Sequence, residues 1–448
     1  MTGQLELPWR DRGETPTTPW SAEEPTVTQG NERSGASGLM ELVCERGNLQ
    51  AALKRVRKNK GSAGIDGMTV DELPEHLKTH WAGLREQLLA GTYRPSPVRR
   101  QTIPKPGGGE RELGIPTVMD RFIQQAILQV LGPRFDPTFS QYSYGFRPGR
   151  SAHDAVVQAQ RYVNEGRRIV VDVDLEKFFD RVDHDVLMGR LAKRIEDKTL
   201  LGLIRRYLKA GMMANGVAVE RHEGTPQGGP LSPLLANALL DEVDKELEKR
   251  GHAFVRYADD CNVYVRSRRA GERVMGLLRR LYSGLRLRVN ESKSAVDRPQ
   301  NRKLLGYSFW DAGNKQVKRK VAPKALNAMK DRVRELTRPT RSQSIARVAE
   351  DLRSYLTGWK NYFRLADTPK VFATLDEWIR HRLRALHLRH WKRGRVTYRE
   401  LRARGLSEHA AARVAANTRR WWKNSAMAIH IAFPNRYFDE LGIPRLAA

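Results

Sequence analysis

The segment from Ile169 to Leu175 alternates apolar and polar residues with the period of a β-strand. Ile169, Val171, Val173 and Leu175 share one face, while Asp172 and Asp174 fall on the other, with Asp174 near the predicted end of the strand. A carboxylate in such a β-branched strand is costly unless it faces solvent or a metal ion. The pattern therefore leaves two interpretations open: an exposed edge strand, or one side of a metal site.

A second segment, Phe254–Val265, has two runs of β-forming residues around a tight centre that contains Asp259 and Asp260. This pattern predicts a hairpin with the two acids at or beside its turn. Adjacent carboxylates repel one another unless a cation lies between them. A solvated turn is the simpler alternative. Together with a strand aspartate, however, the pair would supply the ligands needed to hold two divalent ions.

Most of the remaining chain has helical periodicity or turn composition. Residues 1–38 contain four prolines and no apolar periodicity, which predicts a disordered leader. Two strands joined by a glycine-rich tip are expected within 98–115. Helices are expected at 39–58, 117–131, 185–194, 197–209 and 271–283, and almost throughout after Pro323.

The composition excludes several classes of protein. No run of eighteen apolar residues is present, and the first residues lack the basic start and apolar run of a secretory signal. Cys44 and Cys261 are too few for a disulfide framework or a zinc cluster. We therefore expect a cytoplasmic protein without a membrane partner.

The charge points to a polyanionic partner. The net charge is +29, and residues 315–448 contain 31 Lys or Arg against 11 Asp or Glu. The same segment holds five of the nine tryptophans. Basic side chains can contact phosphates and aromatic rings can stack on unpaired bases, although we expect most of these tryptophans to form the core of a small helical domain.

Several motifs occur in order along the chain: Asp174 with Phe179, Pro226-Gln227-Gly228 with Ser232-Pro233, Tyr257-Ala258-Asp259-Asp260, Asn290–Lys293 and Leu304-Leu305-Gly306-Tyr307. Leu113–Thr117 and Tyr144–Pro148 precede them, and Tyr355–Phe363 follows them. The ordered motifs resemble the palm of reverse transcriptases, and the chain from about residue 40 to its end resembles a group II intron-encoded reverse transcriptase/maturase.

The resemblance implies an α+β fold: a right-hand polymerase with fingers and palm, followed by an all-helical thumb/maturase region and a short basic DNA-binding tail. The implied boundaries are an N-terminal RNA-binding extension at 39–97, fingers and palm at 98–312, thumb/maturase at 313–395 and tail at 396–448. The tail lacks cysteines, so we expect the endonuclease-lacking type. His381, His387 and His390 lie in a basic helix and are interpreted as surface or phosphate-facing residues.

The resemblance also assigns the site. Asp174, Asp259 and Asp260 would be catalytic and would bind two Mg²⁺ ions, assisted by the carbonyl of Leu175. The predicted dNTP-binding residues are Lys105, Arg111, Phe179, Gln227, Gly228 and Lys293. Phe179 would exclude a 2′-hydroxyl, with ordinary core packing as the alternative, and Lys293 would donate a proton to pyrophosphate, with a merely solvated lysine as the alternative.

The implied function is that of an RNA-directed DNA polymerase and splicing maturase, which copies intron RNA into DNA by two-metal nucleotidyl transfer. Its expected partners are group II intron RNA, target DNA, the duplex of RNA template and DNA primer, and dNTPs. Two alternatives remain: an RNA-binding maturase without polymerase activity, and a related reverse transcriptase adopted by a host for repair or defence.

Overall fold

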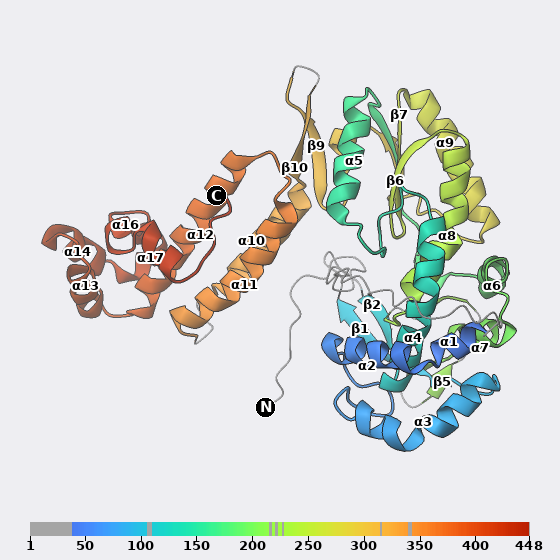
Figure 1. Ribbon diagram of the computed structural model, residues 1–448. Coiled ribbons are helices and arrows are strands. Elements are labelled where there is room, and N and C mark those ends of the chain that lie inside the picture. The colour runs from blue at the N-terminus through green and yellow to red at the C-terminus, as the bar shows by residue number, and fades with distance from the viewer. Residues whose placement is uncertain are drawn as a thin grey trace. The chain divides into compact units, whose positions relative to one another are not determined.

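The computed structural model describes residues 38–104, 110–214, 217–219, 223–225, 228–313, 316–338 and 343–447. The predicted disordered leader lies outside the described residues except for Gly38. The chain divides into two compact units, residues 1–298 and 299–448, and each is described by itself (Figure 1). The finer division into extension, palm, thumb and tail remains a prediction.

The N-terminal unit combines helices with two four-stranded sheets. Its helices are α1 (Leu39–Val43), α2 (Arg46–Asn59), α3 (Leu73–Leu89), α4 (Val118–Phe135), α5 (Ala152–Asn164), α6 (His184–Ala192), α7 (Lys198–Lys209), α8 (Ser232–Lys249) and α9 (Arg268–Gly284). Its strands are β1 (Val98–Pro104), β2 (Glu110–Ile115), β3 (Ile169–Val173), β4 (Met212–Ala214), β5 (Val217–Val219), β6 (Ala253–Tyr257), β7 (Asp260–Val265) and β8 (Ala295–Asp297).

The single helix expected over residues 39–58 is wrong, because the structure has two helices there. Glu45 has extended backbone angles and precedes α2. The side-chain amide of Asn48 donates to the carbonyl of Val43 at 3.0 Å, which satisfies a carbonyl that the end of α1 leaves without a helical partner. The break therefore has a local hydrogen-bonding cause that apolar periodicity does not reveal.

The first sheet has the strand order β2-β1-β4-β5. Strands β1 and β2 pair antiparallel from Arg99 opposite Ile115 to Pro104 opposite Glu110, which confirms the predicted two-stranded element. Its glycine-rich tip, residues 105–109, lies outside the described residues.

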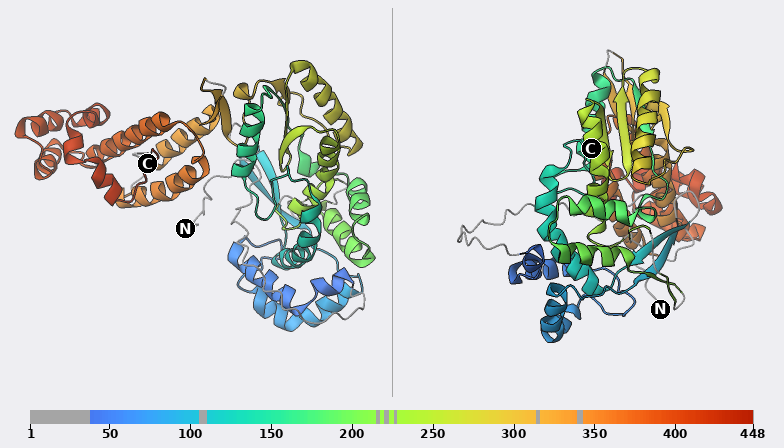
Figure 2. Two further views of the ribbon diagram at one scale, coloured as in Figure 1. Left: turned by 45° about the horizontal axis from the view of Figure 1, so that its top comes forward. Right: turned by 90° about the vertical axis from the view of Figure 1, so that its right-hand side faces the viewer.

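The second sheet is wholly antiparallel, with the order β6-β7-β3-β8. Helix α9 packs on β3 and β8 and helix α8 on β6, while α5 contacts β6 and β7 (Figure 2). At Gly271 of α9 an added Cβ would lie 2.5 Å from Cγ1 of Val296, and Ile169 and Val171 are the next nearest side chains. The apolar face predicted for the strand is thus the face that α9 covers.

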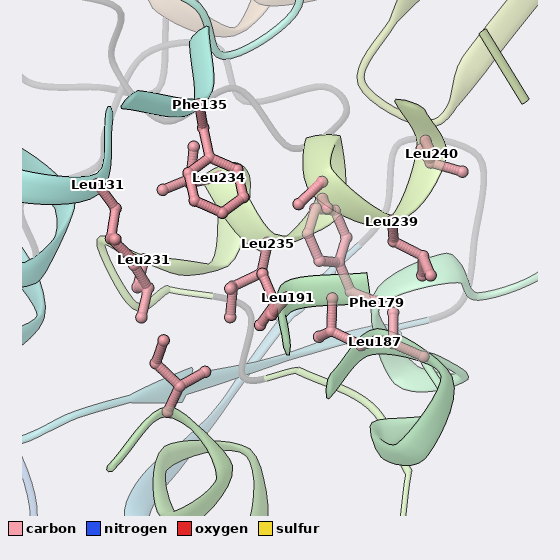
Figure 3. Packing of buried hydrophobic residues seen from close by; sticks show 14 of the residues in the cluster. Leu131, Phe135, Phe179, Leu187, Leu191, Leu231, Leu234, Leu235, Leu239 and Leu240 are labelled. Atoms are coloured by element: carbon pink, nitrogen blue, oxygen red, sulfur yellow. The ribbon is translucent and has the colours of Figure 1, made fainter. Parts of the chain in front are cut away.

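The core beside this sheet joins leucines of α4, α6 and α8 with aromatic residues (Figure 3). Leu187, Leu239 and Leu240 are fully buried, and each such side chain contributes roughly 1.5–3 kcal/mol when it leaves water. This packing holds α8 and the sheet firmly together, and it therefore supports the residues at the ends of the strands.

The C-terminal unit is mostly helical, with one antiparallel hairpin, β9 (Tyr307–Asp311) and β10 (Val317–Val321). Its helices are α10 (Pro323–Leu336), α11 (Ile345–Phe363), α12 (Pro369–His390), α13 (Gly394–Ala403), α14 (Glu408–Ala415), α15 (Trp421–Ser425), α16 (Ile429–Ala432) and α17 (Asn435–Glu440). Trp359 packs in its core, with its ring centroid 4.7 Å from Phe363 and 5.7 Å from Phe372. In neither unit does a described helix have the length and apolar character needed to cross a bilayer.

Candidate active site

The acidic residues of the two predicted segments meet at one end of the second sheet. Strands β3 and β7 pair antiparallel up to Val173 opposite Cys261. The next residues in the same register are Asp174 and Asp260, and directly opposite residues have Cα atoms roughly 4.5–5.5 Å apart. Asp259 lies one residue further on, in the turn between β6 and β7. Segments some 85 residues apart thus bring three carboxylates to one edge.

Residues 288–294 hold the backbone around Asp174. The N–H of Asp174 donates to the hydroxyl of Ser294 at 3.0 Å, and its carbonyl accepts from the N–H of Asn290 at 2.8 Å. Nζ of Lys293 lies 3.7 Å from Oδ1 of Asp174, with 64% of the lysine side chain and 25% of the aspartate side chain exposed. The predicted site residue Lys293 is therefore next to Asp174, and this ion pair is open to solvent.

The turn that carries Asp259 has an unusual backbone. Ala258 has φ of +57°, a left-handed conformation that costs a residue with a Cβ about 1–2 kcal/mol. Gly145 lies directly against this turn: an added Cβ there would be 2.2 Å from the nitrogen of Ala258. Glycine is required at position 145 for this close approach, which accounts for the glycine in the Tyr144–Pro148 motif.

Behind the turn lies a buried charged network that the local sequence pattern did not identify. Arg256 and Asp244 are both fully buried and form an ion pair. Nε of Arg256 donates to Oδ1 of Asp244 at 2.8 Å, and Nη1 donates to Oδ1 of Asn237 and to the carbonyl of Ala258, each at 2.9 Å. Burial lowers the pKa of Arg256, but the Asp244 carboxylate outweighs it, so the pKa is raised and the guanidinium stays charged.

A sequence signal for this network was present in α8. Polar residues recur at positions 237, 241, 244 and 248, the spacing of one helical face, in a helix whose other residues are largely apolar. All four contact residues outside the helix: Asn237 donates to the carbonyl of Gly145, Asp241 pairs with Arg194, Asp244 with Arg256, and Glu248 accepts from Ser140. A polar stripe on a buried helix thus marks where polar or charged partners lie.

Carboxylate and carbonyl oxygens are the ligands that Mg²⁺ prefers, so Asp174, Asp259, Asp260 and the Leu175 carbonyl fit this ion by their chemistry. Within the described residues, no three His, Cys, Asp or Glu side chains are gathered closely enough to hold a metal. Repulsion between carboxylates opposes such gathering unless cations are bound. Backbone register therefore brings the acids to one edge, while their side chains are not assembled as a ligand cluster.

The structure describes the predicted nucleotide-binding residues to different extents. Lys105 and Gln227 lie outside the described residues, and Arg111 lies in β2 opposite Ile103, with only its backbone described. Gly228 has φ of +133°, and an added Cβ would be 2.7 Å from the carbonyl oxygen of Gly114, so glycine is needed there.

Phe179 follows β3 in a 3₁₀ turn, Phe178–Asp180, and only 9% of it is exposed. Its ring lies 5.0 Å from that of Phe178 and among the leucines of α6 and α8 (Figure 3). This position agrees with the alternative interpretation, in which Phe179 packs in the core. Any contact with a sugar has to come from the small exposed part of the ring.

In the C-terminal unit, arginine side chains lie over the rings of Trp378 and Trp422. The guanidinium carbons of Arg334 and Arg382 lie 5.7 and 5.5 Å from the Trp378 ring centroid. Arg382 also lies 5.9 Å from the ring of Trp422, which is 39% exposed. Such an arrangement can contact both phosphates and unpaired bases.

The interpretation of His387 as a surface residue is wrong. Only 8% of it is exposed, and its ring stacks 4.2 Å from that of Phe433. Burial lowers its pKa to about 3, with a smaller effect from Arg404. The apolar partners of His387 come from a segment about 45 residues later in the chain, so local sequence could not reveal them.

An antiparallel sheet packed between helices, with acids at the end of its central hairpin and adjoining strand, is the palm of a right-hand polymerase. Comparison with known families agrees. Residues 103–309 match the reverse transcriptase (RNA-dependent DNA polymerase) family, and residues 326–405 match the group II intron maturase-specific domain.

Individual relatives are similar over part of their length. Protein YkfC of Escherichia coli (strain K12) is 35% identical, over 52% of this chain and 60% of that protein. Group II intron-encoded protein LtrA of Lactococcus lactis subsp. cremoris is 40% identical, over 43% of this chain and 32% of that protein. Nuclear intron maturase 1, mitochondrial, of Arabidopsis thaliana is 38% identical, over 33% of this chain and 27% of that protein.

The chain thus spans less than two thirds of the length of each of these relatives. With its two domain matches in the expected order, it belongs to the family of group II intron reverse transcriptase/maturases.

Proposed function

We propose that this chain is an RNA-directed DNA polymerase that also binds group II intron RNA as a splicing maturase. The observation that carries the polymerase proposal is the register of β3 and β7, which brings Asp174 opposite Asp260 with Asp259 in the adjoining turn. Oxygen ligands at one solvent-accessible edge of a firmly packed sheet suit two-metal nucleotidyl transfer.

Asp174, Asp259, Asp260 and the Leu175 carbonyl would hold two Mg²⁺ ions. When bound, such ions activate the primer 3′-hydroxyl and stabilise the triphosphate and the leaving pyrophosphate. The chain's own residues position the substrates: Lys105 and Arg111 grip the triphosphate, and Gln227 and Gly228 line the templating base pair. Lys293, whose ammonium group lies 3.7 Å from Oδ1 of Asp174, would donate a proton to pyrophosphate.

Primer extension on an RNA template tests the polymerase. The full chain should extend a DNA primer with dNTPs and Mg²⁺, whereas Asp259→Ala should reduce the rate by at least about 10³-fold, since the metals supply several kcal/mol of transition-state stabilisation. Asp241→Asn is the matched control, because Asp241 is a buried aspartate on α8 that pairs with Arg194 and Lys245. If the wild-type chain binds RNA specifically but does not extend a primer, the polymerase proposal fails and only the maturase proposal is kept.

The maturase proposal is supported by the match of residues 326–405 and by the excess of positive charge after residue 315. We infer that the C-terminal unit binds the folded intron mainly through phosphates, with target DNA and the template–primer duplex as further partners. Splicing of a group II intron precursor should be faster with the chain than without it. No acceleration with any group II intron, alongside active primer extension, would favour a host-adopted reverse transcriptase.

A further inference from the structure

The turn Ala258–Asp259 is held from behind the sheet by one side chain. Arg256 precedes it on β6 and pairs in register with Cys261, so its side chain leaves the sheet on the face opposite to that of Asp260. There the guanidinium enters the layer between the sheet and α8, where it is fully buried. It cannot contact a substrate from this position.

Both the backbone and the side chain of Arg256 form hydrogen bonds that hold the strand and its turn. Its backbone N–H donates to the carbonyl of Tyr142 at 2.9 Å, and its carbonyl accepts from the N–H of Tyr144 at 2.8 Å. Its side chain bridges Asp244 and Asn237 of α8 to the carbonyl of Ala258. The carbonyl it holds belongs to the residue with positive φ that directly precedes Asp259.

The turn is also confined from its other side. Asn237 donates through Nδ2 to the carbonyl of Gly145 at 2.9 Å, and Gly145 lies against the nitrogen of Ala258. Asn237 therefore connects Arg256 and Gly145, the two groups that confine Ala258. A strained turn that is fixed on both sides has little freedom to relax.

Stability alone is a weak reason for this arrangement. A buried ion pair is often no more stabilising than apolar side chains of the same volume, because both charges lose their hydration. Apolar residues at these two positions could join α8 to the sheet, but they could not bind the carbonyl of Ala258. The guanidinium is distinguished by its rigid fork of donors, which serves a carboxylate and a carbonyl together.

We propose that Arg256, held by Asp244 and Asn237, is a positioning residue that fixes the conformation of the Ala258–Asp259 turn and thereby places Asp259 and Asp260 for metal binding. The proposal rests on the proposed polymerase site, since it assigns those two aspartates to the metals. It concerns how the site is held and not which groups take part in the chemistry.

The sharpest test replaces the charged pair with apolar residues. Arg256→Met together with Asp244→Leu removes both charges at once, so no unpaired buried charge is left and the fold should be kept. Arg256→Lys is a second variant, which keeps a positive charge but not the fork. Asp241→Asn is the matched control, because it alters a fully buried ion-paired aspartate one helical turn away on α8 that contacts neither Arg256 nor the turn.

Two readouts are measured on the full chain with RNA template and DNA primer. The first is Mn²⁺ affinity from electron paramagnetic resonance, with the Asp259→Asn chain giving the background. The second is the rate of primer extension as a function of Mg²⁺. Thermal unfolding shows that each variant is folded.

We expect the apolar double variant to unfold within a few degrees of wild type, to bind Mn²⁺ about 10-fold more weakly and to extend primers about 10- to 100-fold more slowly. Its KM for dNTP should change little, so that the effect is in kcat and in the Mg²⁺ requirement. Arg256→Lys should fall between this variant and wild type, and Asp241→Asn should resemble wild type.

A folded double variant with wild-type Mn²⁺ affinity overturns the proposal, whatever the polymerase does. If the wild-type chain binds Mn²⁺ through Asp259, and the double variant binds it more weakly, positioning is supported even when no primer is extended; the polymerase proposal alone then fails. A wild-type chain that neither binds Mn²⁺ through Asp259 nor extends a primer overturns both.

Discussion

Phe179 lies in the 3₁₀ turn that follows β3, and only 9% of it is exposed. It is predicted to exclude a 2′-hydroxyl, yet its ring is largely enclosed by core residues. Phe179→Ala should therefore have two effects: a loss of about 3–5 kcal/mol of stability, because a large buried side chain is removed, and a fall in the preference for dNTP over rNTP of about 10- to 100-fold.

Phe178→Ala separates these two effects. Phe178 is 3% exposed and adjacent to Phe179, so its removal should cost a similar stability while leaving sugar selectivity unchanged. The measurements are thermal unfolding and kcat/KM for each nucleotide. Unchanged selectivity in Phe179→Ala would show that the ring serves only the core.

His387 predicts a dependence of stability on pH. Burial lowers its pKa to about 3, while an unfolded histidine has its ordinary pKa near 6.5. Between these values the unfolded state binds the proton and the folded state does not, so stability is full above about pH 6.5 and is lost as the pH falls toward 3. The loss between pH 7 and pH 5 should be about 2 kcal/mol.

Tryptophan fluorescence can follow this unfolding, because six of the nine tryptophans lie at or after residue 310. His387→Phe keeps an aromatic ring against Phe433 and should remove most of the difference between pH 5 and pH 7. His381→Phe, a change at a half-buried histidine of the same helix that stacks on Trp422, is the control. An equal pH dependence in wild type and His387→Phe would contradict the assignment.

At the scale of elements, α9 offers two glycines with opposite expectations. An added Cβ at Gly271 would lie 2.5 Å from Val296, whereas at Gly276 nothing lies within 4 Å. Gly271→Ala must push the helix from the sheet or displace Val296, at a cost of about 1–3 kcal/mol. Gly276→Ala should instead stabilise by about 0.5–1 kcal/mol, the helix-propensity gain. Denaturant unfolding of both variants measures the two signs, and stabilisation by both would mean that α9 does not lie this close to β8.

The palm strands could be predicted from sequence because their information is local. Period-two alternation identified β3, and the paired β-forming runs identified the β6–β7 hairpin, with Asp174, Asp259 and Asp260 in the expected places. Arg256 falls within that predicted hairpin, but nothing in the local sequence indicates that it is buried against Asp244. Its burial depends on how α8 packs against the sheet, which is a tertiary property.

The burial of His387 was not predicted, and that of Phe179 was predicted only as an alternative, for the same reason. Each ring is enclosed by residues far along the chain: leucines of α8 for Phe179, and Phe433 for His387. Spacing along the chain shows which face of an element is apolar, but it does not show which polar or aromatic residue another element will cover. The polar stripe of α8 was the one available clue to the Arg256 network.

At the scale of the whole molecule, a net charge of +29 predicts steep salt dependence of RNA binding. If the chain contacts six to ten phosphates, affinity for intron RNA should fall by roughly 10³- to 10⁵-fold between 50 and 200 mM salt. Substitution of local groups of basic residues can show where those phosphate contacts lie. Lys392 and Arg393, between α12 and α13, and Arg395, in the first turn of α13, are exposed and belong to the segment matched by the maturase-specific domain.

Changing these three residues to Gln should weaken intron RNA binding and reduce the slope of log K against log salt by about one for each phosphate that the variant no longer binds. Arg266, Arg269 and Arg273, around the start of α9, are exposed as well, and their change to Gln alters net charge equally. If only total charge matters, both triple variants will shift the salt curve alike, and the C-terminal unit is then not the RNA-binding region. If the contacts are local, only the first triple variant has a shallower slope, while primer extension on a short template stays the same in both.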